Sequence, residues 1–182
     1  MTTGPNTGKN RKKVLIVGRM PQAGLDALKK RDDVDFEILT DDSAGKLHPA
    51  LKDANAVTLG GTAFRKAELD AAPGMLVVAR LGVGYDAVEI PALNKRKVPL
   101  MTTGIANSVS VAEHAMYMLL ASARLVKKSD RFVRDNAWGD RLSDLPADLS
   151  GKAILVVGMG RIGSRTVKRC VAFEMDVHVL DP

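Results

Sequence analysis

The sequence predicts an α/β protein in two parts, a flavodoxin-like lobe built on a parallel sheet and then the beginning of a second α/β domain. Two observations predict this arrangement. From residue 13 to residue 107, short apolar runs alternate with helical stretches, which is typical of a parallel sheet with helices on both faces. After a long helical segment, a second strand–helix–strand pattern starts near residue 153. We therefore expect the lobe over residues 13–107 and the second domain over 108–182.

The strands expected in the lobe are short apolar runs. They lie at 14–17, 34–39, 56–59, 76–79 and 98–101, and the helices between them lie at 21–30, 65–71 and 90–97. The second of these strands alternates apolar and acidic residues, which suits a strand with one exposed face. We expect the five strands to form one parallel sheet.

The second part starts with the longest helical pattern in the chain. Val111, Ala115 and Met118 follow helical spacing within a helix expected at about 109–133, which is long enough to bridge two lobes. Ser108 is the candidate N-cap of this helix. A polar connector at 138–151 leads to a buried strand at 153–157, a helix at 161–173 and a strand at 177–180. Two strands are too few for a stable sheet, so this domain is expected to be truncated.

Composition and charge argue against several classes of function. The chain of 182 residues carries a net charge of +6, and 46% of its residues are hydrophobic, which is ordinary for a globular protein. A run of basic residues lies near the start, at Lys9, Arg11, Lys12 and Lys13. We expect residues 1–12 to form a disordered basic tail, so the charge does not indicate a nucleic-acid-binding surface.

Cysteine and histidine usage gives no sign of a metal site or a disulfide. The single cysteine, Cys170, falls in step with Ile162 and Phe173 along the expected helix, so we expect it to be a buried apolar residue. The three histidines are far apart in the sequence and lack ligand spacing. No apolar stretch is long enough to cross a membrane, and the start has no secretory signal. A reducing cytoplasm fits these features best.

The strongest motif is the glycine pattern Gly158, Gly160 and Gly163, a G-x-G-x-x-G between an apolar strand and a helix. The first glycine permits a tight turn, the second lets a pyrophosphate approach the backbone, and the third lets helix and strand pack closely. The start of the helix, expected at Arg161, would hold the phosphates with its N–H groups. The strand, turn, helix and later acid together predict a dinucleotide site in the beginning of a Rossmann domain.

The acid that completes this motif is Asp181, which follows the second strand. A carboxylate at that place accepts hydrogen bonds from the adenosine ribose and repels a 2′-phosphate. We therefore expect NAD rather than NADP as the cofactor.

A second glycine turn follows the fourth strand of the lobe. Gly82 and Gly84 would expose backbone N–H groups at the carboxyl end of a parallel sheet. A nest of N–H groups of this kind suits an anion such as a carboxylate. By itself, the pattern fits an ordinary strand-to-helix turn equally well.

The order of three motifs resembles the D-isomer-specific 2-hydroxyacid dehydrogenase family over nearly the whole chain, from about Lys13 to Pro182. The motifs are the Arg80 to Asp86 turn, the Asn107 to His114 segment and the glycine fingerprint. The family includes phosphoglycerate, glyoxylate, D-lactate and formate dehydrogenases. The resemblance implies an NAD-dependent oxidoreductase of a D-2-hydroxy acid, with a small 2-hydroxy or 2-oxo acid as substrate and a homodimer as the complete protein.

The resemblance also assigns roles to individual residues. The backbone of Val83 and Gly84 would hold the substrate carboxylate, and Asn107 would lie near the substrate. The residues implied for the cofactor are Thr103, Ser108, Gly158, Gly160, Arg161, Ile162, Gly163 and Asp181.

No catalytic residue is expected within the chain. The family uses a histidine with a glutamate, assisted by an arginine, and all three lie beyond the second strand of the nucleotide domain. Glu113 and His114 match instead a position on the long helix whose role looks structural. We therefore expect the 182-residue chain to be incomplete and inactive by itself.

The substrate and two other functional interpretations stay open. Phosphoglycerate dehydrogenases usually carry an Arg-Ser pair where this chain has Thr58-Leu-Gly-Gly61, which weakens the interpretation as a phosphoglycerate enzyme. The alternatives to an enzyme are a non-catalytic NAD-binding regulator or corepressor of the same fold, and a degenerate short product without activity.

Overall fold

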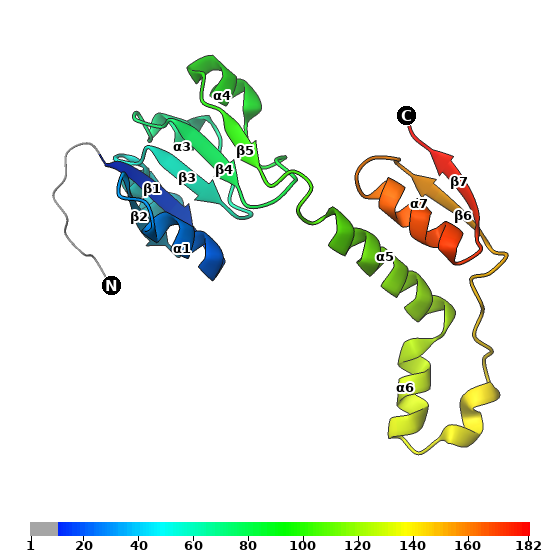
Figure 1. Cartoon of the computed structure of the whole chain (residues 1–182). Helices are drawn as coiled ribbons and strands as arrows, with labels where there is room; N and C mark the ends of the chain where they lie inside the picture. The colour runs from blue at the N-terminus through cyan, green and yellow to red at the C-terminus, as the bar shows by residue number, and fades with distance from the viewer. Residues whose placement is uncertain (1–10) are drawn as a thin grey trace. The chain divides into compact units, whose positions relative to one another are not determined.

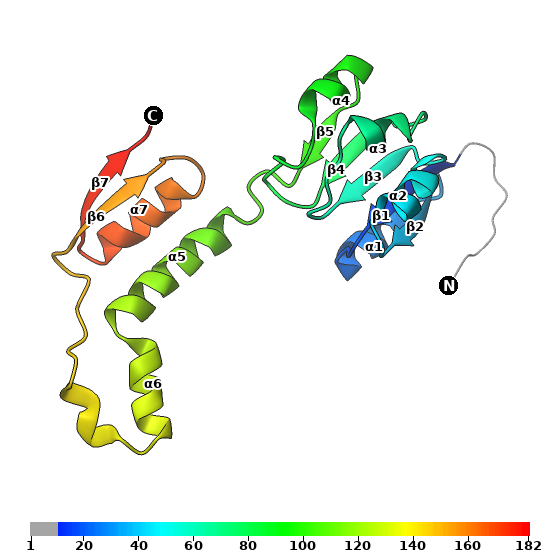
Figure 2. The same cartoon turned by 180° about the vertical axis from the view of Figure 1, so that it is seen from behind.

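The computed structural model describes residues 11–182, and these divide into two compact units. The first unit ends at Gly104 and the second covers Ile105–Pro182, close to the boundary expected at 107 and 108. Figure 1 shows the elements of both units, and Figure 2 shows them from behind. The disorder expected for the basic tail falls on residues 1–10, which lie outside the described residues.

The first unit is built on one five-stranded parallel sheet of order β2-β1-β3-β4-β5. Its strands are β1 (Lys12–Val17), β2 (Val34–Leu39), β3 (Ala56–Leu59), β4 (Val77–Arg80) and β5 (Leu100–Thr102). Because every pair is parallel, all five carboxyl ends lie at the same edge. The prediction of a five-stranded parallel sheet is confirmed.

Four helices connect these strands. They are α1 (Gln22–Lys29), α2 (Ala44–Leu51), α3 (Lys66–Asp70) and α4 (Ile90–Arg96). Only α2, visible in Figure 2, was not expected from the sequence, because Gly45 and Pro49 both disfavour a helix. Leu47 and Leu51, four residues apart on one face, are nevertheless buried. Tertiary burial therefore outweighs poor helix propensity here.

A buried cluster of the first unit lies against one face of the sheet, and Val14 and Ile16 of β1 are buried on the opposite face. Leu15 and Val17 of β1 and Val57 and Leu59 of β3 contribute to it, since alternate residues of a strand point the same way. The helices and loops add Leu47, Leu51, Phe64, Leu69, Val88 and Leu93. This core fixes the strands whose carboxyl ends carry the candidate anion site.

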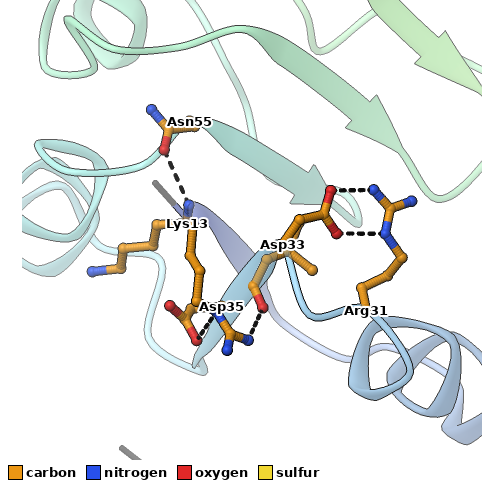
Figure 3. Close-up of polar contacts among 7 residues, drawn as sticks. Lys13, Arg31, Asp33, Asp35 and Asn55 are labelled. Carbon is orange, nitrogen blue, oxygen red and sulfur yellow. Dashed lines mark hydrogen bonds and ion pairs between the residues drawn. The ribbon is translucent and has the colours of Figure 1, made fainter. Parts of the chain in front are cut away.

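Basic residues at the start of the first unit pair with acids of β2. Arg11 Nε lies 3.1 Å from Asp35 Oδ1, and Lys13 Nζ lies 2.8 Å from Glu37 Oε2. The Lys13 N–H also donates to Asn55 Oδ1 at 3.0 Å (Figure 3). The expected tail boundary at residue 12 is therefore wrong: β1 starts at Lys12, so Lys12 and Lys13 of the basic run belong to the sheet.

The second unit has shorter helices than expected. Its elements are α5 (Ser108–Ala123), α6 (Val126–Arg134), a 3-10 turn (Trp138–Leu142), β6 (Ala153–Val157), α7 (Gly163–Ala172) and β7 (Asp176–Leu180). The single helix predicted at about 109–133 is wrong. Leu125 adopts a left-handed conformation with φ of 51°, which ends one helix and starts the next, and the apolar periodicity carries no sign of it.

A small core holds α5 against α7 and the two-stranded sheet. Met116, Leu149, Cys170 and Met175 are buried in it, and Cys170 Sγ lies 3.6 Å from Met116 Sδ. Burial raises the pKa of the Cys170 thiol, so it stays protonated at neutral pH. The prediction of Cys170 as a buried apolar residue is confirmed.

The strand expected to be buried at 153–157 is not buried. β6 alternates exposed and half-buried residues, and Val157 has 70% of its surface exposed. Within residues 11–182, β6 pairs only with β7, and α7 packs against these strands. One face of this short sheet is thus open in the chain described here.

Residues 11–182 contain no candidate for a membrane-spanning helix and none for a metal site. Across residues 11–182, no helix is both long enough and apolar enough to cross a membrane. Within the same range, no group of three or more histidine, cysteine and acidic residues is placed to hold a metal ion.

Candidate nucleotide and anion sites

The glycine fingerprint forms a tight turn between β6 and α7. Gly158 has φ of +97°, a conformation that side chains other than hydrogen disfavour. Its N–H donates to the Leu180 carbonyl at 2.7 Å, which fixes the turn beside the end of β7. Helix α7 begins at Gly163, with Ile162 as its N-cap, two residues later than expected. Gly158 therefore has the conformational role that the sequence predicted for it.

The other two glycines of the fingerprint have opposite surroundings. A Cβ added to Gly160 would meet nothing within 4 Å, so the backbone there is open to solvent. A Cβ added to Gly163 would collide with the Gly158 carbonyl oxygen and would lie 2.9 Å from its carbon. The third glycine thus permits close strand–helix packing, and the second leaves a space that fits a pyrophosphate.

Helix α7 starts directly after the glycine turn. Ser164 and Thr166 satisfy the carbonyls of Gly160 and Ile162 through both their backbone N–H groups and their hydroxyls. The positive end of the helix dipole lies at the same place. Arg161, in the turn itself, is exposed. A helix start with a positive dipole end and a basic residue beside it is a place that can hold an anion.

Asp181 lies directly after β7. This strand pairs with β6, the strand that leads into the glycine turn. Leu180 pairs with Val157 in the sheet, so the residues after both strands, Asp181 and Gly158, start from the same edge. Asp181 is exposed. The structure therefore brings the fingerprint and the acid together in the second unit, which is the arrangement that a bound adenosine ribose would need.

The second glycine turn follows β4 in the first unit. The Leu81 N–H donates to the Leu59 carbonyl at 2.8 Å, and the Thr103 N–H donates to the Gly82 carbonyl at 3.2 Å. Val83 is half-buried and Gly84 is exposed. The structure thus joins this turn to Thr103, the residue after β5, at the carboxyl edge of the sheet.

Asn107 and Ser108 belong to the second unit, at the start of α5. The Asn107 carbonyl accepts the Val111 N–H at 2.9 Å, and Asn107 is the N-cap residue. The expectation of Ser108 as N-cap is wrong. Ser108 is the first helical residue, is 2% exposed, and donates its hydroxyl to the Ile105 carbonyl at 2.8 Å. The predicted site residues are therefore divided between the two units.

Glu113 and His114 have contacts of the kind expected for structural residues. The Glu113 carboxylate accepts from Arg169 of α7 at 3.0 Å, which ties α5 to α7. The His114 ring stacks on Tyr117 of the same helix, with centroids 5.7 Å apart. Neither contact places a base beside the fingerprint.

Sequence reasoning gave no role to Arg80, the last residue of β4. Its Nε is buried and has no hydrogen-bond partner among the described residues, and its guanidinium lies beside Gly82. The signal in the sequence that would have pointed to it is a basic residue two positions before the first glycine of the turn.

The fold defines an α/β protein with a five-stranded parallel lobe and a second strand–helix–strand unit. The sequence profile described as "D-isomer specific 2-hydroxyacid dehydrogenase, catalytic domain" matches residues 14–174. The chain therefore belongs to the D-isomer specific 2-hydroxyacid dehydrogenase family, as the resemblance of its motifs predicted.

Three relatives illustrate the likeness. A D-3-phosphoglycerate dehydrogenase of Archaeoglobus fulgidus is 32% identical over 171 residues, covering 93% of this chain and 32% of the relative. The TT0316 protein of Thermus thermophilus has a TM-score of 0.80 at 28% identity, covering 93% of this chain and 56% of that one. An NAD-dependent formate dehydrogenase of Staphylococcus aureus, solved in complex with NAD, has a TM-score of 0.81 at 24% identity, with the same coverage of both chains. This chain thus spans between about a third and just over half of these relatives.

Proposed function

We propose that the protein to which this chain belongs is an NAD-dependent oxidoreductase of a D-2-hydroxy acid. The observation that carries the proposal is the turn between β6 and α7. Gly158 needs its positive φ, Gly163 has no room for a Cβ, and Gly160 has open space above it. Three glycines with these three distinct constraints fit a dinucleotide pyrophosphate.

Residues 108–182 would then form part of the NAD-binding domain. Gly160, Arg161 and Ile162 would hold the pyrophosphate at the start of α7, and Asp181 would accept hydrogen bonds from the ribose. Thr103 and Ser108 would lie toward the nicotinamide. When bound, NAD would accept a hydride from the substrate carbon that carries the hydroxyl.

The first unit would supply the carboxylate site. The backbone N–H groups of Val83 and Gly84 would hold the carboxylate of a small 2-hydroxy or 2-oxo acid, and the resemblance also assigns Asn107 to the substrate. Holding the carboxylate fixes the position of the adjacent carbon, which is how a positioning site contributes to rate. We assign no proton-transfer residue to this chain. A homodimer, no nucleic-acid partner and a cytoplasmic location remain part of the proposal.

The test of the proposal is cofactor choice at Asp181. Replacing Asp181 by alanine removes hydrogen bonds to the ribose and the repulsion of a 2′-phosphate, so we expect NAD binding to weaken relative to NADP by roughly 1–3 kcal/mol. Titration calorimetry with both cofactors measures this. The control is Asp176→Ala, which removes the same charge at the opposite end of the same strand. It should leave the preference for NAD over NADP unchanged. Equal losses for NAD and NADP in Asp181→Ala would refute the role.

A further inference from the structure

An ion pair joins two helices of the second unit, α5 and α7, which lie side by side (Figure 1). The Arg169 guanidinium of α7 donates from Nη2 to Glu113 Oε1 of α5 at 3.0 Å. Its Nη1 donates to the Arg165 carbonyl, one turn earlier in α7, also at 3.0 Å. One guanidinium therefore connects the carboxylate of α5 to the backbone of α7.

An apolar contact beside this ion pair holds the two helices together without fixing their register. Cys170, the residue after Arg169, is buried against Met116 of α5, and Met116 lies three residues after Glu113, on the same side of the helix. The burial of apolar surface is not directional, and an unbranched methionine adapts to small shifts. The ion pair adds a directional contact at the same level. Because a partly exposed pair contributes little to stability, its main effect is on where α7 lies along α5.

A displacement of α7 would act on the glycine turn at its start. Gly163, the first residue of α7, has no room for a Cβ, because the Gly158 carbonyl lies against it. Arg169 lies roughly 9 Å further along the same helix. Since the turn packs so closely on the helix start, moving α7 changes the position of the backbone at Gly160 and Arg161, where we place the pyrophosphate.

The start of α5 carries other residues of the proposed cofactor and substrate sites. Asn107 is the N-cap of α5 and Ser108 its first residue, and Glu113 follows within the same helix. We propose that Glu113 is a positioning residue that, through Arg169, fixes the start of α7 relative to the start of α5. It thereby sets the spacing between the pyrophosphate end and the nicotinamide end of the cofactor site. This inference rests on the proposed function, because it concerns the same site.

The test compares Glu113→Ala with the unaltered chain, both ¹⁵N-labelled, first without ligand and then in a titration with ADP. ADP carries the adenosine ribose and the pyrophosphate of NAD, and the amide signals of Gly158, Gly160 and Gly163 report the turn. We expect Glu113→Ala to shift these signals before any ligand is added and to weaken ADP binding about 2- to 5-fold, the range for one partly exposed ion pair. The reversed pair, Glu113→Arg with Arg169→Glu, should restore part of the lost affinity.

The matched control is Asp130→Ala, which removes a carboxylate from an exposed ion pair with Arg134 within α6. It should change neither the signals of the turn nor the affinity for ADP, so equal effects of Asp130→Ala and Glu113→Ala would overturn the proposal. Unmoved signals of the turn in Glu113→Ala, or an unchanged affinity for ADP, would overturn it as well. If the unaltered chain does not bind ADP, the proposed cofactor site itself fails and this inference with it, so the two failures are distinguishable.

Discussion

At the scale of single residues, Gly160 and Gly163 of the same turn are expected to have different roles. Gly163 matters for the stability of the fold, and Gly160 matters for NAD binding. Gly163→Ala forces a methyl group into the Gly158 carbonyl, which must push α7 from β6. We expect it to lower the stability of the second unit by about 2 kcal/mol or more, in the range of overpacked sites. Gly160→Ala meets open space and should leave stability within about 0.5 kcal/mol while weakening NAD binding. Urea unfolding and calorimetry together measure the two effects, and equal stability of both variants would contradict the packing argument.

Glu68 makes the first unit sensitive to acid. Burial alone would raise the pKa of this carboxyl, but the Arg65 N–H at 2.8 Å and His48 Nε2 at 3.2 Å outweigh it, so the pKa is lowered. A lowered folded-state pKa stabilises the fold above the unfolded value of about 4.3, and this stability is lost as pH falls through the folded value.

Glu68→Gln should therefore destabilise the chain by about 1 kcal/mol at pH 7 and by much less at pH 3. Urea midpoints followed by circular dichroism at the two pH values provide the measurement. The control is Glu37→Gln, which removes an exposed carboxylate paired with Lys13 at the surface and should cost close to nothing at either pH. A cost for Glu68→Gln that stays constant from pH 7 to pH 3 would argue against this role.

At the scale of elements, helix α4 ends on a residue in an unfavourable conformation. Lys97 is an exposed C-cap with φ of 56°, a region in which glycine is far less strained. Lys97→Gly is expected to stabilise the first unit by about 0.5–1 kcal/mol. Lys95→Gly, two residues earlier within the same helix, should destabilise it by about as much. Thermal unfolding distinguishes the two signs, and destabilisation by both variants would show that the Lys97 side chain matters more than its backbone.

The sequence was most informative where the pattern is local and repeats. The bounds of β2, β3 and β6 agree with the expected ranges, because a short apolar run or an apolar–polar alternation can be recognised without knowledge of distant contacts. The helix break at Leu125 was not predicted, because no glycine or proline marks it. The exposure of β6 was not predicted either, because the burial of a strand depends on which elements pack against it.

In the candidate site, too, local patterns could be predicted from the sequence and features that depend on distant contacts could not. The fingerprint and Asp181 lie close together because both follow paired strands, β6 and β7, and this adjacency follows from the strand–helix–strand order. The unpartnered state of Arg80 could not be predicted, since it depends on the absence of any nearby carboxylate in three dimensions. Sequence reasoning thus located the glycine turns and missed the charge beside one of them.

For the whole molecule, we predict that a polypeptide of these 182 residues alone has no dehydrogenase activity. Removing a hydride from the hydroxyl-bearing carbon requires a positioned base, which typically contributes about 10²–10⁴-fold. Glu113 pairs with Arg169 and His114 stacks on Tyr117, which are contacts of structural residues, so we assign neither the role of the base. The assay follows NADH absorbance with NAD⁺ and a panel of D-2-hydroxy acids, and in reverse with NADH and glyoxylate, pyruvate or hydroxypyruvate.

An active D-3-phosphoglycerate dehydrogenase assayed with its own substrate serves as the positive control for that measurement. Turnover by the purified 182-residue chain that persists through repurification and disappears in His114→Ala would show that His114 is a base after all.

The strand order β2-β1-β3-β4-β5 has a consequence for the growing polypeptide on the ribosome. β1 emerges first and becomes the partner of both β2 and β3; β4 then adds to β3, and β5 adds to β4. Each strand therefore finds its neighbour already synthesised, and none has to wait for a later one or insert between two that have paired. Because domains generally fold from the N-terminus during synthesis, this sheet can be assembled in the order of translation, without rearrangement of earlier pairs.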